Sequence, residues 1–139
     1  MAALLGCGPE QPVWTPQALQ ESYEQTLADI RDVLSERLPA LQWGEQKPAA
    51  AYRSGWSCIA TYASYGSRVG LHQWEDDLER AVGDVIAEHG FGELKDEGGG
   101  TGGWVTHTSA DDRGVTLTIL SKGSVEVHMG APVDDSYCD

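Results

Sequence analysis

The alternation of apolar and polar residues between Val115 and Met129 constrains the fold more than any other feature of the chain. Apolar side chains recur at every second position in two runs, which is the period of a β-strand with one buried face. Strands of this kind need a hydrophobic layer against that face. We therefore predict that they belong to the C-terminal meander of an antiparallel sheet covered by helices.

The connection Ser121-Lys122-Gly123 sets the pairing of these two strands. A two-residue turn would mix apolar and polar side chains on each face, whereas a three-residue loop with a left-handed Gly123 keeps one face apolar. We therefore predict the three-residue loop. The expected apolar pairs are Ile119 with Val125, Leu117 with Val127 and Val115 with Met129, and the expected polar pairs are Thr118 with Glu126 and Thr116 with His128.

A third strand, over 104–109, precedes these two and completes the meander. A five-residue loop after it would bury Val105 and His107, whereas a four-residue loop would bury Trp104 and Thr106. We favour the five-residue loop, and the alternative stays open.

Two amphipathic helices supply the expected cover. The first begins at Thr15-Pro16, an N-cap followed by proline at the first helical position, and continues to about Leu38, before Pro39. The second spans about 71–89, and Gly90 suits the left-handed position that follows a helix. The apolar stripe of the first helix comprises Leu19, Tyr23, Leu27, Ile30, Leu34 and Leu38, and that of the second comprises Trp74, Leu78, Ala81, Val82, Val85 and Ile86.

Shorter apolar runs predict three further strands, one starting at Leu41, one over 56–64 and one over 91–97, with 44–55 as a loop. The predicted fold class is α+β, in the order α-β-β-α-β-β-β-β. Two amphipathic helices then pack on one face of an antiparallel sheet.

The N-terminal residues Leu4-Leu5-Gly6-Cys7 match the lipobox of bacterial lipoproteins, in which the cysteine carries the lipid. The resemblance implies lipidation of Cys7 and an anchor in the outer face of the membrane. Only six residues precede Cys7, fewer than the basic and apolar regions of a signal peptide need. The alternatives are therefore a truncated or misassigned start and an ordinary thiol. We expect residues 1–14 to be a lipobox remnant and tether, and residues 15–139 to be a single domain.

Cys58 and Cys138 form an even pair, which favours a disulfide in an oxidising compartment. The alternative is two buried free thiols. No cofactor or metal site is expected, because the chain has no CxxC motif and no ligand spacing among its histidines, which are His72, His89, His107 and His128.

These features occur together in a familiar order. A lipobox and tether precede a long helix, a strand bearing Cys58, a second helix, a Gly-rich hairpin, a meander and Cys138. This layout resembles the small LppA-type lipoproteins of mycobacteria and related actinobacteria over nearly the whole chain. The resemblance implies an envelope protein without an established enzymatic activity.

The formal net charge of −13 argues against partners that carry phosphate, such as nucleic acid and anionic lipid. No run approaches the roughly 18 apolar residues of a membrane-spanning helix. The run GGGTGG, over 98–103, lacks the Lys-Ser/Thr of a phosphate-binding loop, and no Gly-x-Ser-x-Gly elbow occurs. We expect no catalytic residues.

One segment stands out as a candidate binding surface. No acidic residue occurs between Glu45 and Glu75, although the chain is strongly acidic. Aromatic and cationic residues are typical of recognition surfaces, although part of this segment can equally be a buried strand that excludes acids. The candidate binding residues are Lys47, Tyr52, Arg53, Trp56, Tyr62, Tyr65, Arg68 and His72.

These observations favour a non-catalytic extracytoplasmic lipoprotein that binds a ligand or a protein at the cell envelope. The alternative is a secreted inhibitor or immunity-type factor, such as one encoded by a phage, that acts at the cell surface. An enzyme of the hydrolase class is the weakest hypothesis, because it rests only on the presence of histidines and acids.

Overall fold

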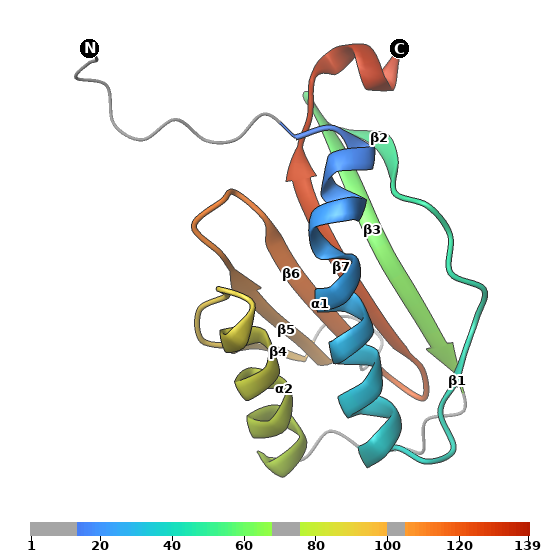
Figure 1. Cartoon of the computed structure of the whole chain (residues 1–139), viewed down its shortest axis with the longest axis vertical. Coiled ribbons are helices and arrows are strands. Elements are labelled where there is room, and N and C mark those ends of the chain that lie inside the picture. Colours follow the sequence, from blue (N-terminus) through green and yellow to red (C-terminus); the bar gives the residue numbers. More distant parts are fainter. Residues whose placement is uncertain (1–13, 68–75, 100–104) are drawn as a thin grey trace.

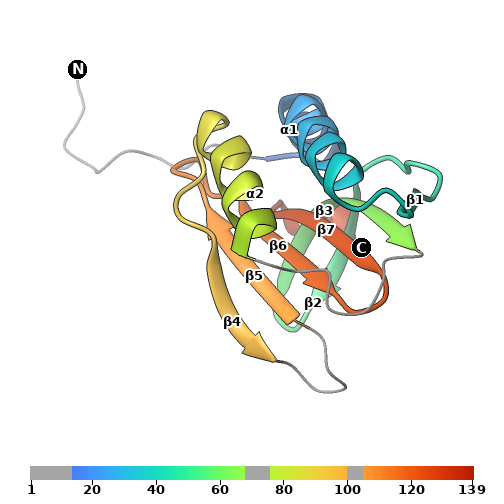
Figure 2. The ribbon, with the colours of Figure 1, turned by 90° about the horizontal axis from the view of Figure 1, so that it is seen from below.

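The computed structural model describes residues 14–67, 76–99 and 105–139. Two helices pack on one face of a seven-stranded antiparallel sheet (Figures 1 and 2), so the predicted α+β class and its element order are confirmed. The elements are α1 (Pro16–Arg37), β1 (Gln42–Trp43), β2 (Ala50–Ser54), β3 (Ser57–Ser67), α2 (Asp76–Glu88), β4 (Lys95–Gly99), β5 (Val105–Ala110), β6 (Thr116–Ser121), β7 (Val125–Pro132) and the 3₁₀ turn η2 (Asp135–Cys138).

The strand order is β1-β3-β7-β6-β5-β4, and β2 pairs with β3 on the edge that β1 also uses. The central pair, β3 with β7, joins segments that are far apart in the sequence. It therefore connects the N-terminal half of the chain to the meander.

Local signals in the sequence account for α1. The hydroxyl of Thr15 accepts a hydrogen bond from the backbone N–H of Ala18, and Pro16 occupies the first helical position. The helix ends at Arg37, two residues before Pro39. The stripe predicted for this helix is buried throughout.

The described part of α2 begins at Asp76, so the residues predicted to open this helix, 71–75, lie outside the described residues. Gly90 has a φ of +88°, and its N–H donates to the carbonyl of Ala87, while the N–H of Phe91 donates to the carbonyl of Ile86. These two bonds define a Schellman motif, which confirms the predicted end of the helix. Leu78, Val82 and Ile86 are its buried residues.

One hydrophobic core lies between the helices and the sheet. It includes Trp14, which we predicted to belong to the tether. The indole N–H of Trp14 donates to the carbonyl of Arg113, and its backbone forms a parallel bridge with Val133. The folded domain therefore includes Trp14.

The β6–β7 hairpin has the predicted face and loop length but a different register. Ile119 pairs with Val127 and Leu117 with Met129, two positions away from the predicted partners. The loop is Lys122-Gly123-Ser124, closed by a backbone hydrogen bond from Lys122 to Ser124, and Gly123 has a φ of +62°. On the other face the predicted polar pairs are likewise wrong, since Thr118 pairs with His128 and Leu120 with Glu126.

The β5–β6 hairpin shows the same difference. His107 is buried, as the five-residue loop predicts, and it pairs with Ile119. The loop spans 111–115 rather than 110–114. Asp111 explains this placement, because its carboxylate accepts hydrogen bonds from the backbone N–H groups of Arg113 and Val115.

One strand was missed and one boundary was predicted incorrectly. Strand β2 lies inside the range predicted as a loop, and β4 begins only at Lys95, because Phe91–Leu94 is irregular. Phe91 and Leu94 are nevertheless buried in the core.

The edge of the sheet opposite β1 and β2 is formed by β4, which is charged and irregular. Lys95 and Asp96 pair with β5 in regular register, and the register then shifts before Gly99. Gly98, with a φ of +85°, lies at this irregularity.

The helices within the described ranges are too short or too polar to cross a membrane.

Candidate functional site

Cys58 on β3 and Cys138 in η2 form a disulfide, with their Cα atoms 5.9 Å apart. The bond holds the C-terminal turn against β2 and β3. Asp134 caps this turn by accepting a hydrogen bond from the N–H of Ser136, and that bond lowers the pKa of the Asp134 carboxyl. The predicted pairing of the two cysteines is therefore present in the structure.

The C-terminal turn also places carboxylates beside the segment between Glu45 and Glu75, which contains no acidic residue. The guanidinium of Arg53 lies 3.2 Å from a carboxylate oxygen of Asp135 and 3.3 Å from one of Asp139. These exposed ion pairs are weak individually. They nevertheless balance the charge of Arg53, so the predicted cationic surface is not cationic around this residue.

The structure separates the other candidate binding residues. Tyr62 is only 4% exposed and packs in the core, so it is not part of a surface. Burial raises the pKa of its hydroxyl, and the nearby charge of Glu24 adds to the effect while Arg31 opposes it. Arg68 and His72 lie outside the described residues. The exposed candidates are Lys47, Tyr52, Trp56 and Tyr65.

The face of the sheet opposite the helices holds a shallow groove of about 450 Å³. Both threonines and apolar residues line it, while the inward residues of the same strands, such as Leu117 and Ile119, fill the core. Both tyrosine and histidine rings contribute to this face. Residues that line the groove include Tyr52, Ile59, Thr61, Thr118, Leu120 and His128.

His128 is held in place by two neighbours. Its Nε2 lies 2.9 Å from a carboxylate oxygen of Glu126, and the ring of Tyr65 meets the imidazole edge to face, with centroids 5.4 Å apart. Tyr65 itself is half exposed. The groove therefore presents the imidazole of His128, which Glu126 and Tyr65 contact.

Trp56 stands at the tip of the β2–β3 hairpin. Ser54 pairs with Ser57, so Gly55 and Trp56 form the turn, and Gly55 has a φ of +60°. The Trp56 side chain is 99% exposed. Tyr52 and Ile59, at the edge of the groove, belong to the same hairpin.

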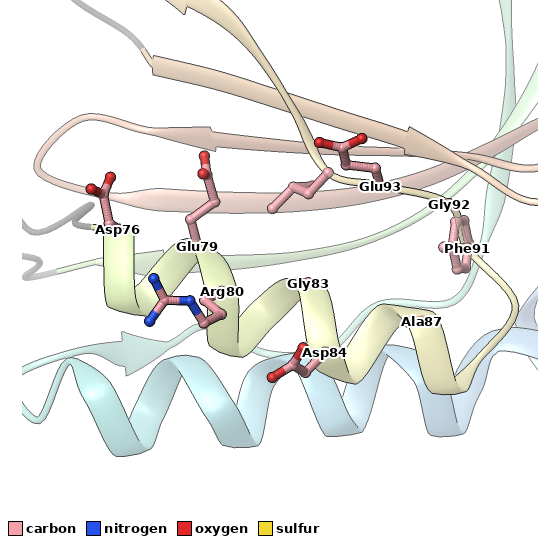
Figure 3. Close-up of a pocket in the computed structure, with 10 residues that line it drawn as sticks. Asp76, Glu79, Arg80, Gly83, Asp84, Ala87, Phe91, Gly92 and Glu93 are labelled. Carbon is pink, nitrogen blue, oxygen red and sulfur yellow. The ribbon is translucent and has the colours of Figure 1, made fainter.

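A second hollow, of about 610 Å³, lies between α2 and the irregular segment Phe91–Leu94 (Figure 3). Acids predominate among its charged residues, which are Asp76, Glu79, Asp84, Glu93 and Arg80. Figure 3 shows the carboxyl groups of Asp76 and Glu79 on the same side of α2. This hollow therefore favours cations over anions.

Glu79 belongs to a further cluster that the sequence did not indicate. His107 on β5 is fully buried, and its Nε2 lies 2.7 Å from Oε1 of Glu79 and 3.9 Å from Oδ2 of Asp96. The three residues come from α2, β4 and β5 and are far apart in the sequence. The pairing of β4 with β5 and the packing of α2 on the edge of the sheet assemble this set, which the spacing of the residues in the sequence does not reveal.

No family model, no curated protein and no solved structure matches this chain. The resemblance to LppA-type lipoproteins, the lipidation of Cys7 and the absence of catalysis stay predictions.

Proposed function

We propose that this chain is a non-catalytic extracytoplasmic protein that binds a protein partner on the open face of its sheet. The exposed Trp56, at the tip of the hairpin that contributes Tyr52 and Ile59 to the groove, carries the proposal. Tryptophan is enriched among the residues that dominate binding energy at interfaces, and an indole left in water contributes little to the fold. The β2–β3 hairpin therefore offers an aromatic anchor at its tip and contributes to a surface of mixed chemistry along its strands.

The chemistry of the groove favours a partner with both apolar side chains and hydrogen-bonding groups. Ile59 and Leu120 offer apolar contacts, while Thr61, Thr118 and His128 offer donors and acceptors. The net charge of −13 favours a basic partner, because opposite charges accelerate association.

Two features support a location outside the cytosol. The disulfide of Cys58 and Cys138 is a bond that persists in oxidising compartments. The lipobox-like residues before Cys7 support a lipid anchor at the outer face of the cell membrane. Mass spectrometry of the protein produced in an actinobacterium tests the anchor, since a diacylglyceryl group on Cys7 is expected. An unmodified cytosolic product would contradict it.

In the binding experiment, the purified protein is cross-linked to an envelope fraction of the cells that produce it, and the cross-linked partner is identified. The affinity of the purified protein for that partner is then measured by titration. We expect Trp56→Ala to weaken binding by about 30-fold or more, which corresponds to a hot-spot loss of about 2 kcal/mol. We expect Leu120→Ala to weaken it by a smaller factor. Tyr137→Ala is the matched control, because Tyr137 is an exposed aromatic residue that lies against α1 on the helical side.

The position of Trp56 at a hairpin tip favours a second candidate, an inhibitor or immunity-type factor that inserts this hairpin into an enzyme. An enzyme as the cross-linked partner, inhibited by the native protein but not by Trp56→Ala, would select it. A partner that binds equally well to Trp56→Ala, Leu120→Ala and the native protein would remove the open face as the binding surface.

A further inference from the structure

We propose that Glu79, Asp96 and His107 bind one divalent transition-metal ion at the edge of the sheet, under α2. The proposal is independent of the binding function of the open face, because these residues lie on the helical side. One potential ligand atom from each residue lies within 4.8 Å of the other two.

The distances suit a metal ion of the size of zinc. Ligand atoms about 2.0–2.1 Å from a tetrahedral metal lie about 3.3 Å from one another. The separations from His107 Nε2, 2.7 Å to Glu79 and 3.9 Å to Asp96, bracket this value. Rotation of the Glu79 and Asp96 side chains, whose ligand atoms lie within 4.8 Å of each other, would complete the site.

The three residues combine a fixed ligand with two accessible ones. His107 is fully buried, while the side chains of Glu79 and Asp96 are 37% and 59% exposed. The imidazole is thereby held by the core, and the carboxylates face the side from which an ion and its water ligands can arrive. Backbone pairing of Asp96 with His107 places these two side chains on the same face of adjacent strands.

The orientation of Asp96 also favours coordination. Its Oδ1 accepts a hydrogen bond from the N–H of Gly98, which leaves Oδ2 directed at His107. Ligating carboxylates are commonly held in this way by a second hydrogen bond. Within the described residues, neither Glu79 nor Asp96 forms an ion pair with a lysine or arginine.

The surrounding charge would raise the local concentration of cations. Glu79 also lines the acidic hollow described above, together with Asp76, Asp84 and Glu93 (Figure 3). Two carboxylates next to one imidazole leave the cluster with excess negative charge when His107 is neutral. A divalent ion would balance that charge.

The donor set selects the class of metal. One imidazole nitrogen with two carboxylate oxygens suits zinc and its neighbours, with a remaining position for water, whereas calcium and magnesium prefer six or more oxygen ligands. Zinc is therefore the probe of choice, and calcium tests whether the acidic surface binds cations without selectivity.

The experiment is a calorimetric titration of the oxidised full chain with Zn²⁺, in a Cys7→Ser background so that the thiol does not compete. We expect one Zn²⁺ per chain, and a loss of affinity of at least about 10-fold in Glu79→Gln and in Asp96→Asn. Both positions are partly exposed, so these variants retain the fold, which circular dichroism checks. Nitrogen-15 shifts of the histidine side chains identify the imidazole that binds.

Two other histidine–carboxylate pairs serve as matched controls. His89 lies 2.8 Å from Asp29, and His128 lies 2.9 Å from Glu126, and neither pair has a third ligand among residues 14–67, 76–99 and 105–139. Asp29→Asn and Glu126→Gln should therefore bind Zn²⁺ as the Cys7→Ser protein does, and Ca²⁺ should not displace the ion. The proposal is overturned if Zn²⁺ does not bind, if Glu79→Gln and Asp96→Asn bind it with unchanged affinity, or if the His107 resonances do not shift.

Discussion

The carboxylate of Asp29 on α1 lies 2.8 Å from Nε2 of His89, which follows the last residue of α2. This partly buried contact joins α1 to the end of α2. Its hydrogen bond from His89 is the main reason that the pKa of the Asp29 carboxyl is lowered, and a second bond from Gln25 adds to the effect.

A lowered pKa makes this contact sensitive to acid. A carboxylate with a folded pKa below its unfolded value stabilises the protein above the unfolded pKa, and the stabilisation is lost as the pH falls through the folded pKa. We expect Asp29→Asn to lower the urea midpoint at pH 6. The difference from the native protein should shrink once the pH is below 3.8, the ordinary value for this group.

Asp32→Asn is the control for this effect, because Asp32 lies on the exposed face of the same helix. Its urea midpoint should follow that of the native protein at every pH. If Asp29→Asn lowered the urea midpoint by the same amount at pH 6 and well below pH 3.8, the ionised Asp29 carboxylate would not be the source of the stabilisation.

The disulfide should contribute a large part of the stability. Cys58 and Cys138 are separated by 80 positions, and the chain-entropy model assigns a loop of that length about 4 kcal/mol. We expect the double variant Cys58→Ser, Cys138→Ser to lose about 2–4 kcal/mol of unfolding free energy in guanidinium. Cys7→Ser should leave the unfolding free energy unchanged. Detection of three titratable thiols in the native oxidised protein would refute the pairing of Cys58 with Cys138.

Two leucines on the same strand test which face of the sheet is buried. Leu117 is completely buried, whereas Leu120 points to the open face. We expect Leu117→Ala to cost about 2–5 kcal/mol, because it leaves a cavity in the core, and Leu120→Ala to cost about 1 kcal/mol or less. Denaturant unfolding measures both, and equal losses would place the two side chains in similar environments.

Substitution by alanine should change the stability in opposite directions at Gly83, inside α2, and at Gly90, just after its end. Gly90 has a φ of +88°, which alanine tolerates poorly, so Gly90→Ala should destabilise the protein by about 1 kcal/mol. A Cβ at Gly83, inside the helix, would meet no atom within 4 Å. Gly83→Ala should therefore raise the melting temperature, with a gain of about 0.5–1 kcal/mol. A lower melting temperature of Gly83→Ala would show that Gly83 has a role other than its place in the backbone of α2.

The sequence predicted the faces of the strands but not their partners. Burial of Leu117 followed from the period of two and burial of His107 from the favoured five-residue loop, yet both hairpins are displaced by two residues from the expected register. A shift of two leaves every side chain on the same face, so hydrophobic pattern does not distinguish the two registers. The hydrogen bonds of the loops decide between them, through Asp111 and Lys122.

The candidate sites show a different limit. Strand β2 was missed because its residues are mostly exposed and carry no alternation of burial, so only its pairing with β3 reveals it. The absence of acidic residues between Glu45 and Glu75 suggested a cationic surface. In the folded protein, however, Asp135 and Asp139 form ion pairs with Arg53. Local composition does not report charges contributed by a distant segment.

The irregular strand β4 has a consequence for how other molecules meet this protein. An exposed strand edge normally offers a template for a foreign strand. The break in pairing between Asp96 and Gly99, together with the charges of Lys95, Asp96 and Glu97, removes the straight row of amides that such an addition requires. The addition of a strand from another copy of the chain is thus disfavoured along this edge of the sheet.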